Sequence, residues 1–187
     1  MINRKTTNKA ACVIWITGMS GSGKTTLASE IKSALETEGY NLLILDGDQV
    51  RDSYKEKLSF TRDDIFKNNL RIAKKCLSAR DQHDVIIVPV ISPYEKSRRE
   101  VRKLLEPDFH LIYLKADIES LKERDPKGLY SAADAGLLKN LIGYCDSTPY
   151  EEPNKYELMI NTSKGHSVKK ASDKLFKYIN DRVISCL

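Results

Sequence analysis

The sequence has few cysteines and no long apolar run, and both shortages exclude whole classes of protein. Its four cysteines are separated by 64, 69 and 41 positions in a chain of 187 residues. These intervals match neither a short-spaced metal site nor the disulfide framework of a small secreted domain, so we expect buried, inert thiols. No stretch approaches the roughly 20 apolar residues that a membrane-spanning helix requires, and no membrane partner is expected.

The N-terminus lacks the pattern of a signal peptide. Residues 1–11 (MINRKTTNKAA) are polar and basic, and no apolar signal core follows them. We therefore expect a cytoplasmic protein. A hydrophobic content of 41% and a charged content of 30% are ordinary for a globular chain, and the length predicts one domain over residues 1–187.

Excess positive charge is absent from the middle of the chain. The net charge is +5, but residues 1–10 carry three basic side chains, and residues 164–187 carry six against two acidic ones. Residues 11–163 therefore have a net charge of −2. Because the basic excess lies at the two ends, we do not expect a nucleic-acid polymer as a partner.

What the chain does contain is an alternation of short apolar runs and longer helical patterns. Strands are predicted at 12–17, 41–45, 85–90, 109–114 and 156–160, and helices at 24–38, 61–80, 95–105, 118–124 and 166–184. Residues 125–155 lose this periodicity and contain three glycines and three prolines, which is typical of a functional loop. We therefore predict an α/β fold with a mostly parallel sheet, helices on both faces, and a lid at residues 124–155, hereafter the lid segment.

The stretch GMSGSGKT, residues 18–25, fits the phosphate-binding pattern G-x-x-x-x-G-K-[ST] at every fixed position. It stands between a predicted strand and a predicted helix, which is the context that the pattern requires. The glycines let backbone N–H groups surround phosphate oxygens, Lys24 would reach the β- and γ-phosphates, and Thr25 would hold Mg²⁺. The predicted nucleotide-binding residues here are Gly18, Ser20, Gly21, Ser22, Gly23, Lys24, Thr25 and Thr26.

Two carboxylates follow the second predicted strand. Asp46 and Asp48 flank Gly47, and ligands of open α/β sheets bind beyond the carboxyl ends of the strands. Phosphoryl transfer needs a group that orients or deprotonates the attacking hydroxyl, and an oxygen ligand for the metal. These two residues are candidates for both roles. The alternative is an Asx turn in which Asp48 caps the next helix.

Four further motifs, LDGDQVR, ISPY, RDPKGLY and PYEEP, follow the phosphate loop in order. With them the chain resembles adenylylsulfate kinases over residues 11–163. These enzymes transfer the γ-phosphate of ATP to the 3′-hydroxyl of adenylyl sulfate. The resemblance implies a P-loop kinase fold, ATP and Mg²⁺ as cofactors, a nucleotide acceptor and a homodimer.

On the acceptor side, the resemblance implies a role for each matching residue. Asp48 would lie by the 3′-hydroxyl and the metal as the candidate base. Arg51 would contact the acceptor's phosphate, although an exposed surface role is the alternative for such a residue. Phe60 would stack on the acceptor's base. The implied acceptor pocket also includes Asn68, Ile91 and Ser92.

The resemblance also implies functions for the lid segment, whose closure would exclude water. Arg124 would stand at its entrance and contact the nucleotide, where cations stabilise the charge in transfer. The implied acceptor-binding residues of the lid segment are Lys127, for which an exposed surface role is again the alternative, and Gly128, Leu129, Lys139 and Leu141.

The sequence departs from the family's pattern after the LDGDQVR motif. The family reads F-S-x-x-D-R-x-E-N-I-R-R, whereas residues 60–71 read FTRDDIFKNNLR, so that Ile65 replaces an acceptor-binding arginine. This replacement loses a charged contact to an anion. Arg62 lies three residues earlier, near the same helical face, and we hypothesise that it reaches the same anion.

The lid segment departs as well. The family's K-K-A-R-A-G-E-I-K becomes SAADAGLLK at 131–139, so three cations are lost and Lys139 is retained. Leu141 replaces the aromatic residue that would enclose the acceptor's adenine together with Phe60. Glu95 replaces the basic residue that usually follows the S-P-Y motif.

These departures leave three interpretations open. One is divergence within a true adenylylsulfate kinase, with Arg62 or Tyr144 compensating. Another is a different nucleotide acceptor, such as cytidine diphosphoramidate in capsule synthesis, because losing one base–aromatic contact, worth about 1–3 kcal/mol, weakens discrimination for adenine. The third is a nucleotide-binding switch or partner protein without transfer activity, against which the presence of Lys24, Thr25 and Asp48 argues.

Overall fold

The protein is built around a five-stranded sheet in which every pair of neighbouring strands is parallel. The computed structural model describes residues 10–56 and 58–186, so the basic N-terminal segment lies outside the described residues. The strand order is β2-β3-β1-β4-β5. The strands are β1 (Cys12–Thr17), β2 (Leu42–Ile44), β3 (Val85–Pro89), β4 (Phe109–Lys115) and β5 (Leu158–Asn161).

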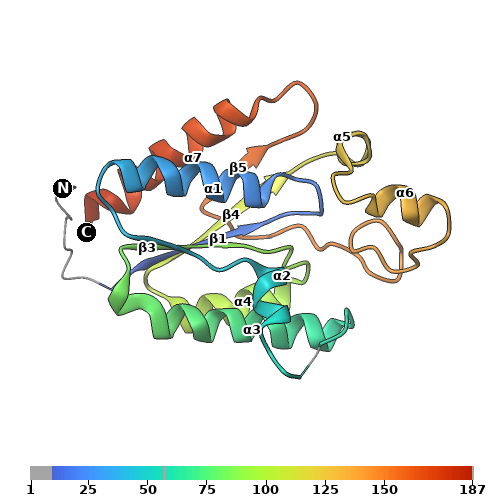
Figure 1. The fold of residues 1–187 in the computed structure, drawn as a ribbon, viewed down its shortest axis with the longest axis horizontal. Coiled ribbons are helices and arrows are strands. Elements are labelled where there is room, and N and C mark those ends of the chain that lie inside the picture. Colours follow the sequence, from blue (N-terminus) through green and yellow to red (C-terminus); the bar gives the residue numbers. More distant parts are fainter. Residues whose placement is uncertain (1–9, 57, 187) are drawn as a thin grey trace.

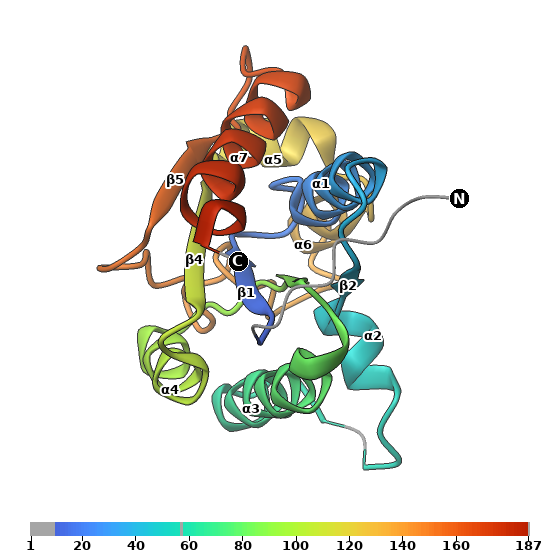
Figure 2. The same cartoon turned by 90° about the vertical axis from the view of Figure 1, so that its left-hand side faces the viewer.

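Helices cover both faces of this sheet (Figures 1 and 2). Helices α1 (Lys24–Thr37) and α7 (Val168–Arg182) pack on one face, and α3 (Arg62–Ala79) and α4 (Glu95–Leu105) pack on the other. The short helices are α2 (Gly47–Asp52), α5 (Ile118–Arg124) and α6 (Leu129–Asp134), and single 3₁₀ turns occur at Arg80–Gln82 and Ile184–Cys186. The predicted α/β fold is confirmed.

The central strand β1 shows why the sequence folds into these layers. Its side chains alternate between two cores, with Ile14 and Ile16 in the core under α1 and α7, and Val13 and Trp15 in the core under α3 and α4. All four are fully buried. Burial of one such side chain stabilises the fold by about 1.5–3 kcal/mol, so a strand that is apolar on both faces belongs at the centre of a covered sheet.

The predicted elements agree with the structure within two residues at each end. Two helices were not predicted, namely α2 and α6, which have six residues each. The second lies inside the lid segment, which is therefore partly helical. Among the described residues, no helix is long and apolar enough to cross a membrane.

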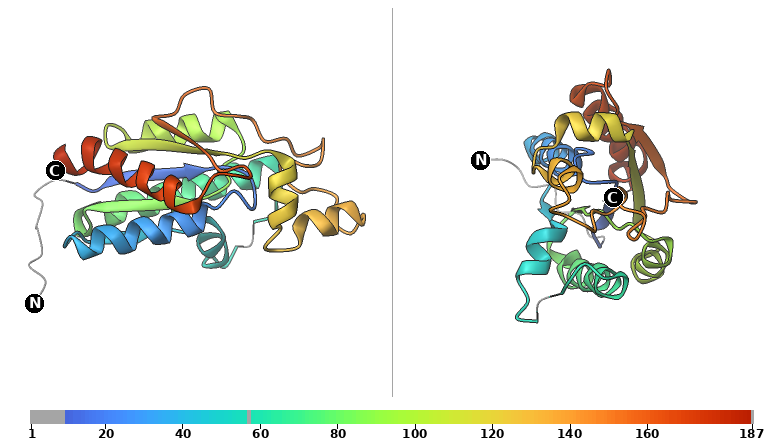
Figure 3. Two further views of the ribbon diagram at one scale, coloured as in Figure 1. Left: turned by 90° about the horizontal axis from the view of Figure 1, so that it is seen from above. Right: turned by 90° about the vertical axis from the view of Figure 1, so that its right-hand side faces the viewer.

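The parallel arrangement brings the loops that follow the strands to one edge of the sheet. The phosphate loop follows β1, Asp46 follows β2, residues 91–94 follow β3, and α5 follows β4. Helices α5 and α6 project beyond the same edge (Figure 3). Motifs that are far apart in the sequence are thereby placed around one space.

Candidate functional site

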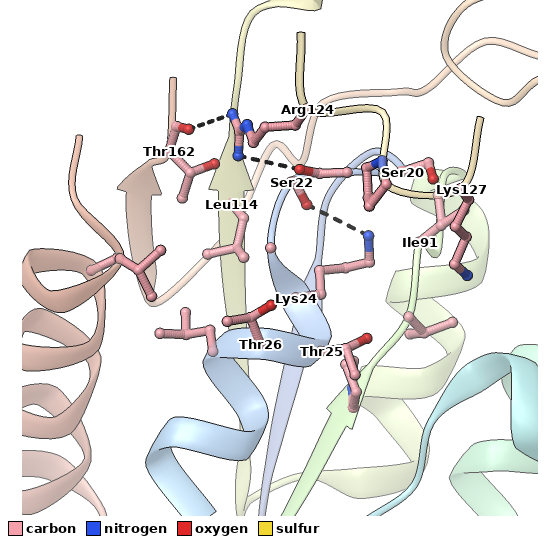
Figure 4. A pocket seen from close by; sticks show the side chains of 18 of the residues that line it. Ser20, Ser22, Lys24, Thr25, Thr26, Ile91, Leu114, Arg124, Lys127 and Thr162 are labelled. Carbon is pink, nitrogen blue, oxygen red and sulfur yellow. Dashed lines mark hydrogen bonds between the residues drawn. The ribbon is translucent and has the colours of Figure 1, made fainter. Parts of the chain in front are cut away.

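A cavity of about 640 Å³ opens at this edge of the sheet (Figure 4). Its walls come from the phosphate loop, from the start of α2, from the loop after β3, from the start of the lid segment and from the start of α7. The predicted site residues that line it are Ser20, Gly21, Ser22, Gly23, Lys24, Thr25, Thr26, Asp48, Ile91, Arg124 and Lys127.

The backbone of the phosphate loop requires glycine at two positions. Gly23, which precedes α1, has φ of 92°, a left-handed conformation that side chains with a Cβ rarely adopt. At Gly18 the limit is space, because an added Cβ would lie 2.7 Å from the carbonyl oxygen of Leu114 in β4. These restrictions allow the loop to curl over the N-terminus of α1, where backbone N–H groups and the helix dipole favour an anion.

Lys24 points back along this loop. Its Nζ donates to the carbonyl oxygen of Met19 over 2.7 Å and lies 3.5 Å from Ser22 Oγ. Burial lowers the pKa of Lys24 from its ordinary value of 10.5 to about 8, while Asp48 acts in the opposite direction. A desolvated ammonium group whose hydrogen-bond partners are neutral oxygens favours an incoming phosphate, because the phosphate's negative charge stabilises the protonated lysine.

The helix-capping role that the sequence analysis considered for Asp48 belongs to Asp46. Its Oδ1 accepts a hydrogen bond from the Asp48 backbone N–H over 2.9 Å, so Asp46 is the N-cap of α2. Its Oδ2 accepts a hydrogen bond from Thr25 Oγ1 over 3.3 Å. The carboxylate beside the Thr25 hydroxyl is therefore Asp46, whereas the resemblance assigned the metal-binding carboxylate to Asp48. A hydroxyl and a carboxylate oxygen are donors of the kind that Mg²⁺ binds, usually together with phosphates and water.

Asp48 lies beside a residue of the lid segment. Its Oδ2 accepts a hydrogen bond from Lys127 Nζ over 2.9 Å, and both side chains are more than half exposed. This contact raises the pKa of Lys127 above its ordinary value. The pair bridges the cavity between the start of α2 and the entrance of the lid segment.

Arg51 and Phe60 contact each other next to this pair. The Arg51 guanidinium lies 4.5 Å from the centroid of the Phe60 ring, and its Nη1 donates to the carbonyl oxygen of Ser59 over 2.6 Å. The Phe60 ring is 52% exposed, so one face of it is available to a ligand. Asn68 is buried, and its Nδ2 donates to the carbonyl oxygen of Gly47 over 3.3 Å, whereas its buried Oδ1 has no partner among the described residues.

The region around Ile65 is apolar. Ile65 is buried against Tyr94 and Ile142, and Ile91, which lines the cavity, packs against this group. Arg62 lies over the same Tyr94 ring, 4.3 Å from its centroid, and forms an ion pair with Glu151 at the end of the lid segment. The prediction that Arg62 lies near the same face as Ile65 agrees with this geometry, and its partner in the structure is a carboxylate.

Arg124, the last residue of α5, links the phosphate loop to the loop after β5. Its Nη1 donates to the carbonyl oxygen of Gly21 over 3.2 Å, and its Nη2 donates to that of Thr162 over 2.6 Å (Figure 4). Beyond Arg124, the cavity extends along the start of α7. The lining residues at this end, which the motifs did not mark, are Leu114, Thr162, His166, Ser167, Val168 and Ala171.

Several predicted residues of the lid segment do not line the cavity. Leu141 is buried in a separate cluster with Leu121 and Tyr130, and Leu129 packs at the margin of that cluster. The structure therefore does not place Leu141 opposite Phe60. Gly128, which is exposed and precedes α6 with φ of 65°, and Lys139, which is exposed, also lie outside the cavity lining. Outside the lid segment, the predicted site residues that do not line the cavity are Gly18, Arg51, Phe60, Asn68 and the buried Ser92.

The lost cations of the lid segment are replaced by an internal contact network. Asp134 accepts hydrogen bonds from both Lys122 and Tyr144, and the Lys122 Nζ lies 2.6 Å from Asp134 Oδ2. Tyr144 stacks edge-on against Tyr130, with ring centroids 5.4 Å apart. Tyr144 thus stabilises the lid segment itself, while the predicted compensation for Leu141 stays a prediction.

The sequence is similar to those of known proteins. The profile of the family described as adenylylsulphate kinase matches residues 10–161. An adenylyl-sulfate kinase of Bacillus licheniformis is 38% identical over 171 residues, which are 91% of this chain and 85% of the relative. An adenylyl-sulfate kinase of Marinobacter nauticus is 38% identical over 176 residues, which are 94% of this chain and 87% of the relative.

The fold is also similar to solved structures. The structure of the Mycobacterium tuberculosis APS kinase CysC in complex with AMPPNP and APS superposes with a TM-score of 0.82. The superposition covers 91% of this chain and 98% of that chain at 27% sequence identity. Both the sequence and the arrangement of helices and strands therefore lead to the same group of kinases.

Proposed function

Because this chain belongs to the adenylylsulphate kinase family, we propose that it transfers the γ-phosphate of ATP to the 3′-hydroxyl of adenylyl sulfate. The products are ADP and 3′-phosphoadenylyl sulfate. The observation that carries this proposal is the contact between Lys127 and Asp48 in the same cavity as Lys24. Two cations and a carboxylate in one cavity support the proposal, because a terminal phosphate needs positive charge and an attacking hydroxyl needs a proton acceptor.

The phosphate loop holds the donor. The triphosphate lies along residues 20–25, with its charges at the N-terminus of α1. Lys24 leaves its carbonyl partner and binds the transferring phosphate, which raises the lysine's pKa because a negative charge replaces a neutral oxygen. The end of the cavity beside Arg124, Thr162 and Val168 receives the base and the ribose.

Thr25 and Asp46 are the residues that would hold Mg²⁺, since their side-chain oxygens lie 3.3 Å apart beside the phosphate loop. When bound, this ion neutralises charge on the phosphate oxygens. The resemblance assigned the metal to Thr25 and Asp48. We keep Asp48 near the metal, with Asp46 as the carboxylate that lies beside Thr25. Its contact with Lys127 directs one of its oxygens toward the lid segment.

Asp48 acts as the base in this proposal. It accepts the proton of the acceptor's 3′-hydroxyl while the oxygen attacks the γ-phosphorus, and the bond from that phosphorus to the β-phosphate's bridging oxygen breaks. Lys127, released from Asp48 by the hydroxyl, stabilises the negative charge on the transferring group. The two residues therefore exchange partners during one turnover.

The acceptor lies between α2, α3 and the loop after β3. Phe60 stacks on its base, Arg51 contacts its phosphate, and the free Oδ1 of Asn68 accepts a hydrogen bond from it. Ile91 forms an apolar wall of the same region. Arg62 supplies a second cation for the acceptor by leaving Glu151, because Ile65 has no charge to offer.

The lid segment, residues 124–155, closes over the bound nucleotides and excludes water in this proposal. Gly128, Leu129, Lys139 and Leu141 contribute by shaping the segment rather than by lining the open cavity. We further propose that residues 1–187 act as one kinase domain in the cytoplasm, and that the protein is a homodimer, which light scattering after size-exclusion chromatography would test.

The decisive experiment supplies the purified protein and MgATP with adenylyl sulfate or cytidine diphosphoramidate in parallel reactions. We expect ADP formation that depends on adenylyl sulfate, and a product that carries its new phosphate on the 3′-hydroxyl by nuclear magnetic resonance. The Lys24→Ala variant serves as the control for contaminating kinases, because it removes the ammonium group that binds the transferring phosphate.

Each of the other outcomes would overturn the proposal. ADP formation only with the cytidine compound would assign a different nucleotide acceptor to the same cavity. If calorimetry shows nucleotide binding but neither acceptor compound leads to ADP formation, the protein is a nucleotide-binding protein without transfer activity. Equal ADP formation by wild type and Lys24→Ala would contradict the assigned role of the phosphate loop.

A further inference from the structure

Ser92 has an unusual backbone conformation beside the cavity. Its φ is 44°, which makes it the one non-glycine residue in the left-handed region of φ among residues 10–56 and 58–186. This region of φ and ψ is costly for a residue with a Cβ, and it persists only where the surroundings enforce it. Ser92 is 1% exposed and directly follows Ile91, which lines the cavity.

Contacts from three elements hold Ser92 in place. Its Oγ accepts a hydrogen bond from Asn69 Nδ2 of α3 over 2.9 Å. Its carbonyl oxygen accepts one from Arg98 Nη1 of α4 over 2.7 Å and a longer one, 3.4 Å, from Thr17 Oγ1 at the end of β1. The shortest of these contacts comes from the guanidinium group.

Arg98 is itself almost completely buried, with 2% of its side chain exposed. It makes an ion pair with Glu95 on the same helix, 2.7 Å from Nη2 to Oε2. Its Nη2 also donates to the carbonyl oxygen of Glu151 over 2.7 Å. One planar cation therefore joins the loop after β3 to the end of the lid segment, without lining the cavity.

We propose that Arg98 is a positioning residue for the acceptor: it holds Ser92 in its left-handed conformation and so fixes Ile91 at the acceptor side of the cavity. This proposal rests on the proposed function. Only a fork of donors in one plane reaches Ser92, Glu95 and Glu151 together, whereas a lysine offers a single ammonium group. The phosphate loop, which binds the donor, makes none of these contacts.

The test compares Arg98→Lys with Arg99→Lys, its exposed neighbour on α4. We expect Arg98→Lys to lower kcat/KM for adenylyl sulfate by about 10- to 100-fold, because small displacements of a substrate-contacting wall have effects of this size. The Kd of an ATP analogue and the kinetics of Arg99→Lys should stay within about twofold of wild type. A melting temperature lowered with unchanged kcat/KM would show a merely structural role and overturn the proposal.

A rescue experiment tests the backbone conformation directly. Glycine adopts positive φ without strain. Adding Ser92→Gly to Arg98→Lys should therefore raise kcat/KM for the acceptor about three- to tenfold above that of Arg98→Lys alone. Ser92→Ala in the same background removes the same hydroxyl but keeps the Cβ, and we expect no recovery. Equal recovery by both variants, or by neither, would contradict the proposed link between Arg98 and Ser92.

Two further measurements keep the proposal testable if a variant does not fold or the proposed function is wrong. Glu95→Gln removes the charge that orients the guanidinium on a partly exposed side chain, and we expect about a three- to fivefold loss of acceptor kcat/KM. Wild type that is inactive with adenylyl sulfate would contradict the proposed function alone. In that case a crystal structure of Arg98→Lys decides: Ser92 at negative φ supports the proposal, and Ser92 at its original φ overturns it.

Discussion

Lys127 Nζ lies 2.9 Å from Asp48 Oδ2, although 79 residues separate the two in the sequence. One residue comes from the entrance of the lid segment and the other from the start of α2. The contact therefore joins a part of the site that moves in the proposed mechanism to a part that is fixed on the sheet. Removal of either partner should affect transfer more than binding of the donor.

We predict that Lys127→Ala lowers kcat by about 10²–10³-fold, because a cation that stabilises transferring charge is lost. The Kd of an ATP analogue should change little, since the phosphate loop remains intact. Steady-state kinetics together with calorimetric titration would check both values. Lys115→Ala is the control, because Lys115 is an exposed lysine that pairs with Glu152 outside the cavity. A Lys127 variant with normal kcat would show that the contact with Asp48 is only a surface ion pair.

The lowered pKa of Lys24 predicts that nucleotide binding takes up a proton at alkaline pH. In the free protein the pKa of Lys24 is about 8, so Lys24 is charged below this pH and becomes neutral above it. A bound triphosphate favours the charged form, and affinity should therefore fall by up to about tenfold for each pH unit above 8. Calorimetry at pH 9 in two buffers of different ionisation heat would measure the proton uptake.

The same shift has an effect of known sign on stability. The pKa of Lys24 is lower in the folded protein, about 8, than its ordinary value of 10.5. The unfolded chain therefore binds more protons between these values, and this residue makes the free protein more stable as the pH rises from 8 to 10.5. Lys24→Met should remove both this contribution and the proton uptake. Identical binding heats in the two buffers would contradict the assigned lysine titration.

Asp46 and Asp48 should be separable by their response to magnesium. We predict that Asp46→Asn raises the magnesium concentration needed for half-maximal activity, because Asp46 is the carboxylate beside Thr25. Asp48→Asn should instead lower kcat by about 10²–10⁴-fold at saturating magnesium, as expected for loss of a base. Activity assays over a magnesium titration would distinguish the two. Asparagine remains an effective N-cap, so both variants should keep α2, and reversed effects would exchange the proposed roles.

Arg62 provides a test of how this chain compensates for Ile65. We predict that Arg62→Ala raises KM for adenylyl sulfate by about tenfold, the usual effect of losing a hydrogen bond to a charged group, with kcat and the KM for ATP little changed. Glu151→Gln should have the opposite effect on acceptor KM, because Arg62 no longer has to leave an ion pair. If acceptor binding is intact in Arg62→Ala, Arg62 does not replace the missing arginine.

The sequence predicted the elements that carry a clear period and missed those that do not. Strand β1 and helices α4 and α5 were placed with their observed bounds, because runs of buried residues and charged helical repeats mark them. Helices α2 and α6 contain six residues each, fewer than two helical turns, and are too short to show a period. Their starts are set by Asp46, which caps α2, and by Gly128, which precedes α6.

Site residues could be predicted where a motif fixes them, but their pairings could not. Motifs define Asp48 and each position of the phosphate loop, and residues 20–25 and Asp48 line the cavity. The Arg62–Glu151 pair joins residues 89 positions apart, and no local pattern encodes it. In the lid segment, Leu141 and Ile142 are adjacent and both apolar, yet they pack into different clusters. In a loop without a period, the sequence alone does not tell which of two such neighbours packs into which cluster.

In the proposed site, the residues that bind the phosphate donor are separate from the residues that bind the alcohol acceptor. In the proposed mechanism, one continuous loop after β1 holds the triphosphate, whereas side chains from α2, α3 and the loop after β3 bind the acceptor. Substitutions among the proposed acceptor-binding residues can therefore change the bound alcohol while the phosphate loop is kept. In this chain the phosphate loop matches its pattern at every fixed position, and the replacements at Ile65, Glu95 and Leu141 all fall outside it. Such a scaffold is a natural starting point for directed evolution toward new nucleotide alcohols.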